Sequence, residues 1–365
     1  MKKRRHSKKR IPKSKKYTII GAIFIPFALL LVGLGFLFYQ PTPGPQALPQ
    51  GAPSLSNNLH GPKKLSDEEY KTLKNQLFDL VDRQNPKAAL TKLSQLMDTS
   101  PSVFSSCHAL VHEIGHEAYK NYHDVSKALR YSDELCGSGY LHGVIEEYFN
   151  NTVDPFSRMK TLCDSSDFTR QYDICHHAVG HGLMYFTGNN LPLSIEKCDA
   201  YGTLRERTRC AEGVYMENFN TDQKLHPSRY LNPDNPFYPC ASQPTFYKAI
   251  CYFYAPIYFL SLRNDDYVGA MRWCQSAPKG YPSACTDGLA TRIMKQNINN
   301  PKLVEQVCVS GVKKQVNPCI DGMVSYYVVN FNSASSARNM CQKLAPEHRG
   351  QCLRSVNARL SLFVN

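Results

Sequence analysis

The chain has 365 residues, 42% hydrophobic and 20% charged, which is an ordinary composition for a folded globular protein. The formal net charge is +13, but residues 1–16 hold ten lysines and arginines and no acid, so the rest carries only about +3. We therefore expect a folded protein and no nucleic-acid partner.

The N-terminal part of the chain predicts a basic cytoplasmic tail followed by a membrane anchor. The uncharged segment Tyr17–Tyr39 has 23 residues, enough to span a bilayer, and carries a tyrosine at each end, where interfaces favour aromatic side chains. A cleaved signal peptide is the alternative, but the apolar run is too long and lacks a clear small-x-small cleavage site. Because positive charges stay inside, we expect residues 1–16 in the cytoplasm and Gln40–Asn365 outside it.

The segment after the anchor predicts a linker and then one extracytoplasmic domain. Residues 40–63 are rich in proline, glycine and serine, a composition typical of extended linkers. All fourteen cysteines lie further along the chain. Their even number permits complete pairing, and disulfides persist in oxidising compartments. We therefore predict a single-pass membrane protein whose folded domain, residues 64–365, lies outside the cytoplasm.

The folded domain opens with a cysteine-free helical hairpin. SDEEYKTLKNQLFDLVD has a capping-box pattern at Ser66 and Glu69, and NPKAALTKLSQLM has Pro86 where a first helical residue is expected. We expect this hairpin to cap the array that follows.

Twelve cysteines form six close pairs that recur with a period near 34 residues, the length of a helix–turn–helix repeat. Each pair, separated by 11 or 12 positions, predicts a disulfide from the end of one helix to the start of the next, contributing about 3 kcal/mol. The six pairs are Cys163/Cys175, Cys198/Cys210, Cys240/Cys251, Cys274/Cys285, Cys308/Cys319 and Cys341/Cys352. Cys107 and Cys136 remain, and we pair them by elimination. The predicted fold is an all-α array of helical hairpins, an α-solenoid.

This plan resembles the tetratricopeptide and Sel1-like class of helical repeats, including its disulfide-stapled secreted members. The resemblance covers the period and hairpin plan of roughly residues 64–360, and the large and small consensus residues of those repeats do not line up. It concerns architecture and implies little about function.

The second helices, aligned at their cysteines, give four rows with metal-ligand residues, followed by four rows without histidine. The four rows are CHALVHEIGHEAY, CGSGYLHGVIEEYF, CHHAVGHGLMYF and CAEGVYMENF. Three rows carry ligand-type residues four apart, on one helix face. We predict a shared site for zinc or iron, with copper as an alternative. Its expected ligands are His112, His116, His142, Glu146, His177 and His181, with Glu217 as an outer or additional ligand.

Other features of these rows have simpler interpretations. His142 and His181 are each followed by a glycine, which suits close approach of a backbone or a bound group. We expect His108 and His176 to be packing residues or donors behind the ligands, and Glu117, His123 and Glu147 to be solvated. The aromatic segment Tyr252–Leu260 is expected to be solenoid core.

The motif HEIGH, His112–His116, raises the question of a zinc hydrolase, in which both histidines bind zinc and the glutamate acts as general base. It resembles the zincin helix, which would make Glu113 the catalytic base. The metzincin continuation is absent, because Tyr119 and Tyr122 stand where that pattern has glycine and histidine. A gluzincin-like arrangement needs only a later glutamate, but no edge strand for a peptide substrate is evident. The histidine and carboxylate pairs are also similar in type and spacing to the ligands of helical di-iron proteins.

Two classes of function remain from the sequence. One is a membrane-anchored metal-binding protein, as a hydrolase with Glu113 as base or as an oxidase with iron or copper. The other is a protein-interaction solenoid whose histidine-free C-terminal repeats bind a protein partner.

Overall fold

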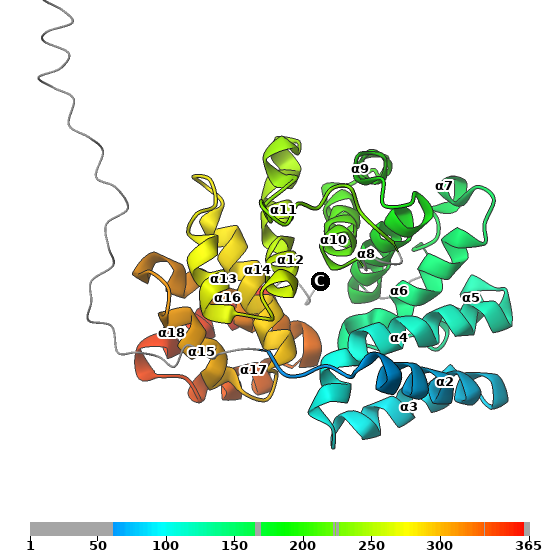
Figure 1. Cartoon of the computed structure of the whole chain (residues 1–365), viewed down its shortest axis with the longest axis horizontal. Coiled ribbons are helices and arrows are strands. Elements are labelled where there is room, and N and C mark those ends of the chain that lie inside the picture. Colours follow the sequence, from blue (N-terminus) through cyan, green and yellow to red (C-terminus); the bar gives the residue numbers. More distant parts are fainter. Residues whose placement is uncertain (1–60, 165–168, 222, 224–225, 332, 361–365) are drawn as a thin grey trace, which may run out of the picture. The chain divides into compact units, whose positions relative to one another are not determined.

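The computed structural model describes residues 61–360, apart from 165–168, 222, 224–225 and 332. Within these residues the regular elements are all helices (Figure 1). None of these helices has the length and apolar character needed to cross a bilayer. The predicted tail, the predicted span Tyr17–Tyr39 and nearly all of the predicted linker lie outside the described residues.

Most helices follow one another through short connections, and helices that are neighbours in the sequence pack against each other. Their bounds are α2 (Asp67–Arg83), α3 (Pro86–Met97), α4 (Pro101–Tyr122), α5 (Val125–Leu129), α6 (Leu135–Asn150), α7 (Pro155–Arg158), α8 (Thr169–Phe186), α9 (Leu191–Asp199), α10 (Leu204–Asn220), the 3₁₀ helix η1 (Cys240–Ser242), α11 (Thr245–Tyr254), α12 (Pro256–Leu262), α13 (Tyr267–Cys274), α14 (Pro282–Gln296), α15 (Pro301–Val309), α16 (Lys313–Phe331), α17 (Ala334–Gln342) and α18 (Pro346–Leu360).

The first hairpin is formed as predicted. The Ser66 hydroxyl accepts from the Glu69 backbone N–H, and the Glu69 carboxylate accepts from the Ser66 N–H at 2.9 Å, which completes the capping box of α2. Pro86 is the first residue of α3, and Asn85 caps that helix. Because α2 and α3 both pack on α4, they cover the start of the array.

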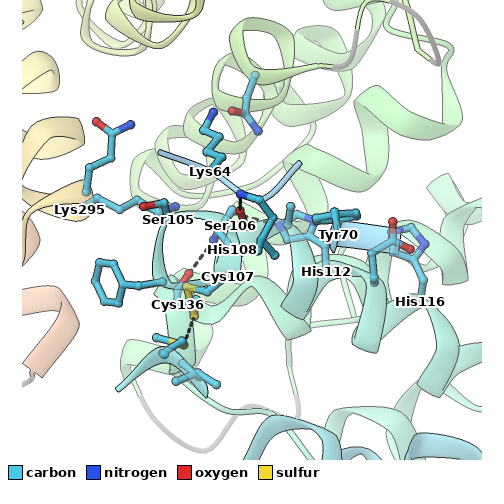
Figure 2. Close-up of a pocket in the computed structure, with 18 of the residues that line it drawn as sticks. Lys64, Tyr70, Ser105, Ser106, Cys107, His108, His112, His116, Cys136 and Lys295 are labelled. Carbon is cyan, nitrogen blue, oxygen red and sulfur yellow. Dashed lines mark hydrogen bonds between the residues drawn. A yellow bond between two sulfur atoms is a disulfide. The ribbon is translucent and has the colours of Figure 1, made fainter. Parts of the chain in front are cut away.

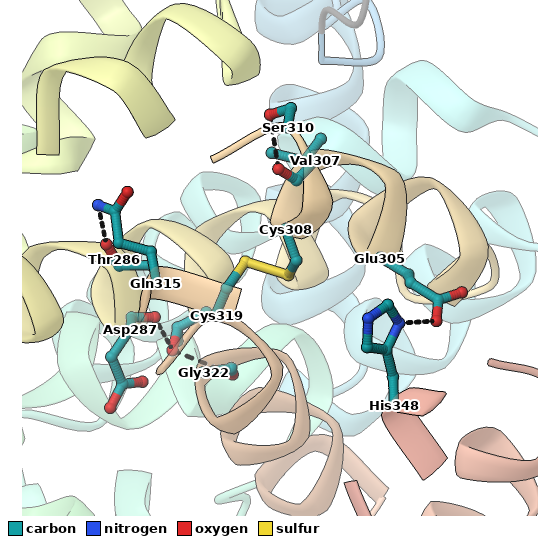
Figure 3. The surroundings of a disulfide bond; sticks show 11 residues. Thr286, Asp287, Glu305, Val307, Cys308, Ser310, Gln315, Cys319, Gly322 and His348 are labelled. Carbon is teal, nitrogen blue, oxygen red and sulfur yellow. Dashed lines mark hydrogen bonds and ion pairs between the residues drawn. A yellow bond between two sulfur atoms is a disulfide. The ribbon is translucent and has the colours of Figure 1, made fainter. Parts of the chain in front are cut away.

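All seven predicted disulfides are present, and no cysteine in the described residues is free. The Cα atoms of each pair are 5.4–6.0 Å apart. Figure 3 shows Cys308–Cys319, which joins α15 to α16. Seven disulfides point to an oxidising, extracytoplasmic environment.

The start of the second helices differs from the prediction, which put it at the cysteine. α10 begins at Leu204, six residues before Cys210, because Thr203 and Glu206 form a capping box there. The first two turns therefore lie before the disulfide. The predicted aromatic helix is interrupted at Pro256, which lacks an N–H and separates α11 from α12.

The second helices pack side by side and bring distant rows together. Contacts run from α4 through α6, α8, α10, α11, α14 and α16 to α18, and α16 also contacts α6. The buried apolar residues form two clusters, the first spanning Leu73 to Ala277 and the second Leu260 to Val356. Most of the aromatic segment belongs to them, with Tyr252 and Leu260 each about 1% exposed, as predicted.

Glycines allow neighbouring second helices to approach at backbone distance. A Cβ atom on Gly143 of α6 would lie 2.0 Å from the His112 carbonyl oxygen of α4, and one on Gly213 of α10 would lie 1.9 Å from the His177 oxygen of α8. Gly143 thus serves the close backbone approach predicted for it. At Gly182 the nearest atoms belong to side chains, the closest 3.1 Å away on Phe149.

Candidate metal centre

A cavity of about 940 Å³ is lined by the histidines of the first row and by glutamates of the second and fourth rows, among them Glu146 and Glu217. The first row places one more histidine at the cavity than the two that were predicted as ligands. His108, His112 and His116 follow one another at four-residue spacing on α4, and all three line the cavity (Figure 2). α6 supplies His142 and Glu146, α8 supplies His177 and His181, and α10 supplies Glu217.

His112 is the centre of one set of short contacts. Its Nε2 lies 3.2 Å from His108 Nε2 and 3.1 Å from His142 Nδ1, and its Nδ1 lies 3.3 Å from Glu146 Oε2. Two nitrogens bound to one zinc ion at 2.0–2.1 Å are about 3.3 Å apart, so the separations of His112 Nε2 from His108 Nε2 and from His142 Nδ1 fit a common ion. His112 Nδ1, on the other side of the ring, faces Glu146 instead.

His108 is oriented from behind by an unusual turn. Cys136, Gly137 and Ser138 at the start of α6 have φ of 55°, 73° and 61°, a left-handed conformation that is costly for the two residues with a side chain. The Cys136 carbonyl accepts from His108 Nδ1 at 2.6 Å. The lone pair of His108 is therefore on Nε2, the atom that faces His112.

His181 is the centre of a second set of contacts. Its Nε2 lies 3.2 Å from His177 Nε2, and its Nδ1 lies 2.8 Å from Glu217 Oε2. The His142 and His181 rings stack with their centroids 4.5 Å apart, which places the two sets side by side.

Glu146 lies between the two sets. Its Oε2 is 2.9 Å from His116 Nε2 and faces the first set, while its Oε1 is 3.7 Å from His181 Nδ1 in the second. The side chain is buried, and Oε1 has no hydrogen-bond partner among the residues that the structure describes. A buried carboxylate oxygen without a partner is costly, so a cation there would satisfy it.

Four overlapping groups in the described residues have ligand atoms within 4.8 Å of one another. They are His108–His112–His142, His142–His177–His181, His112–His116–Glu146 and Glu146–His181–Glu217. Each has three donors, the minimum that protein sites for transition metals usually offer.

Burial sets the protonation of the imidazoles. It lowers the pKa of His108, His142 and His177 well below the ordinary value, so these rings are neutral at pH 7 and able to bind a metal. His116 differs, because hydrogen bonds to Glu146 and Glu147 outweigh its burial and raise its pKa to about 9. A metal ion would have to displace the proton from His116.

The seven residues predicted as ligands all fall within the four groups. Glu113, the predicted base, belongs to none of them; it lines the cavity, and its Oε1 lies 3.6 Å from Lys74 Nζ.

The sequence interpretation was wrong about Glu147 and incomplete about His108. Glu147 is buried and its Oε2 lies 2.8 Å from His116 Nδ1, because α6 turns both of its adjacent glutamates toward α4. His108 was expected behind the ligands but is a member of the first group. Its spacing of four from His112 was the available signal. His176 lies apart, packed between Tyr172 and Tyr201.

No protein family, curated protein or solved structure matches this chain. The resemblance to tetratricopeptide or zincin proteins therefore rests on architecture and motif alone.

Proposed function

We propose that this protein is an extracytoplasmic metalloenzyme with two transition-metal ions bridged by Glu146. The observation that carries the proposal is the buried Glu146 carboxylate. One of its oxygens lies among the α4 histidines, and the other lies near His181 without a hydrogen-bond partner in the described part of the chain. A carboxylate shared by two ions would satisfy both oxygens.

The donors around Glu146 divide into two sets. His112 and His116 accompany Oε2, and His181 and Glu217 accompany Oε1. His108, His142 and His177 complete the surroundings as neutral imidazoles. Imidazole with carboxylate suits zinc and iron, and the high share of imidazole also suits copper.

The cavity supports catalysis rather than storage of metal. About 940 Å³ of space adjoins the donor groups, which is enough for a small substrate. When bound, the metal ions would supply Lewis-acid or redox chemistry. In a hydrolase, the Glu113 carboxylate on the cavity wall would accept a proton from water, and in an oxidase it would have no such role.

The anchor forms part of the same proposal. The oxidising environment indicated by seven disulfides agrees with the orientation predicted from residues 1–39, with the tail inside and the domain outside. The metal centre would then act at the outer face of a membrane.

The test is the metal content of the purified full-length protein, measured by inductively coupled plasma mass spectrometry. We expect two ions per chain in the wild type. His112→Ala, His142→Ala and His181→Ala should each remove at least one ion, because each deletes a donor. His123→Ala, at an exposed position at the end of α4, is the matched control and should keep both.

Two glutamate variants separate the roles. Glu146→Gln should lose at least one ion, because a neutral amide lacks the negative charge with which a carboxylate can bind two cations. Glu113→Gln should keep both ions and, in a hydrolase, lose turnover. Wild-type protein that folds but binds no transition metal would overturn the proposal and favour the protein-interaction solenoid. If the His142 and His181 variants each retain a single ion, the metal site would be limited to the HEIGH motif, His112–His116.

A further inference from the structure

One wall of the cavity carries two cations from a repeat without histidine. Arg292 and Lys295 are three residues apart on α14, and therefore share one helix face. Both line the large cavity and also a second one of about 380 Å³ that reaches His142 and His177. His108 is on the wall of both cavities, so the two cations stand where the cavities meet.

Neither cation has a hydrogen-bond or ion-pair partner among the described residues. No hydrogen bond or ion pair within 4.0 Å joins Arg292 or Lys295 to any described residue. Burial lowers the pKa of Lys295 well below its ordinary value, and the charge of Arg292 adds to this. Burial also lowers the pKa of Arg292, against a weak opposing effect from Asp265. Two half-buried cations that line the same two cavities repel each other, and a bound anion would relieve this repulsion.

The nearby carboxylates are engaged elsewhere. In the smaller cavity, Glu212 accepts from Arg209 at 2.6 Å, and Asp173 lies 3.4 Å from the same guanidinium group. In the larger cavity, Glu113 is paired with Lys74. These acids balance other cations. Glu134 also lines both cavities and the Asp265 charge acts on Arg292, but among the described residues neither acid forms an ion pair with Arg292 or Lys295, so both cations can bind a ligand from outside the chain.

The two cations are close to the histidine groups. Burial is the main cause of the lowered pKa of His108, and the positive charge of Lys295 is the second cause. Tyr326 of α16 also lines both cavities. The Tyr326 hydroxyl and His108 Nδ1 lie on either side of Gly137, since a Cβ atom built on Gly137 would be 3.9 Å from each of them. Figure 2 shows Lys295 on the same side of the pocket as Ser105 and His108.

We propose that the substrate is a small molecule with an anionic group, a carboxylate or a phosphate, which Arg292 and Lys295 bind while its reacting part reaches the histidines. The guanidinium fork and the ammonium supply charge-assisted hydrogen bonds to the anion, and the Tyr326 hydroxyl is available as a further donor. The role of this site in a reaction rests on the proposed metalloenzyme, but the anion site itself needs no metal.

Calorimetric titration of the full-length protein with inorganic phosphate, and separately with acetate, tests the anion site. Each titration is run on protein as purified and after removal of metal with a chelator. We expect one of the two anions to bind in both preparations, and the stronger one identifies the group. Lys295→Met should weaken binding at least about tenfold, since a hydrogen bond to a charged group is lost. Lys295→Arg should recover most of it. Lys302→Met, at an exposed position of α15, is the matched control and should bind like the wild type.

A second measurement does not depend on the folding of any variant. Acetylation of lysines in the wild-type protein, followed by peptide mass spectrometry, should show Lys295 protected by the bound anion and Lys302 unaffected. Equal binding by Lys295→Met and wild type, or equal labelling of Lys295 with and without anion, overturns the anion site. Anion binding by protein that contains no transition metal as purified would overturn only the metalloenzyme.

Discussion

Replacement of Gly143 by alanine would disturb the packing that brings the first two histidine rows together. The new Cβ atom would lie 2.0 Å from the His112 carbonyl oxygen and 2.8 Å from its carbonyl carbon. Both atoms belong to the backbone of α4 and cannot rotate away, so the two helices themselves would have to separate.

The size of the effect follows from that distance. A carbon atom ordinarily approaches a carbonyl oxygen to about 3.3 Å, so α4 and α6 would move apart by about 1.3 Å. Overpacking of this kind costs about 1–3 kcal/mol, and alanine in a helix returns up to about 1 kcal/mol. We expect a net loss of about 1 kcal/mol in the free energy of unfolding. The 3.1 Å contact between His112 and His142 would be lost as well, so metal content should fall.

Urea unfolding followed by circular dichroism, with the disulfides intact, gives the stability, and the metal content is measured on the same samples. Gly202→Ala is the control, because no atom lies within 4 Å of its added Cβ atom. Its stability should stay within about 0.5 kcal/mol of the wild type. If Gly143→Ala matches Gly202→Ala in both measurements, the close approach of α4 and α6 is not required.

Two further predictions concern a buried acid and the membrane topology. Burial raises the pKa of Asp287 from 3.8 to about 6, so the folded chain holds this proton more tightly than the unfolded chain, and stability falls as pH rises between these values. Asp287→Asn should therefore exceed the wild type in urea midpoint at pH 7.5 and lose that advantage at pH 3.5, whereas an equal difference at both pH values would contradict the assignment. A protease added outside intact cells should cut the linker Pro41–Pro62; cleavage confined to residues 1–16 would reverse the predicted orientation.

The hairpins and disulfides were predictable because their signals are local. A cysteine pair 11 or 12 residues apart leaves little choice of partner once helices flank it, and all seven pairs formed as expected. The capping box at Ser66 likewise depends on only four consecutive residues, 66–69. The alignment of the repeats also predicted that His112, His142 and His181 lie near one another, since stacked repeats place corresponding helices side by side.

Other features depend on how helices turn and where distant rows meet. The left-handed turn at Cys136–Ser138 follows no residue preference except that of Gly137, because tertiary contacts impose it. Two adjacent glutamates look alike in a sequence, and only the packing of α6 on α4 shows that Glu147 is buried with Glu146.

The largest gap between sequence and structure is the contact of α16 with α6. Aligned rows predict the neighbours of each repeat, but not that the sixth disulfide repeat comes to lie beside the second row of histidines. That contact turns the histidine-free repeats from a separate binding surface into a wall of the cavity, with Arg292 and Lys295 facing it. Under the two proposals above, the histidine rows would hold metal ions, and Arg292 and Lys295 would bind the anionic group of the substrate. The repeat period identifies which helices carry metal-ligand residues or cations, whereas the packing of distant helices determines which of these residues line the same cavity.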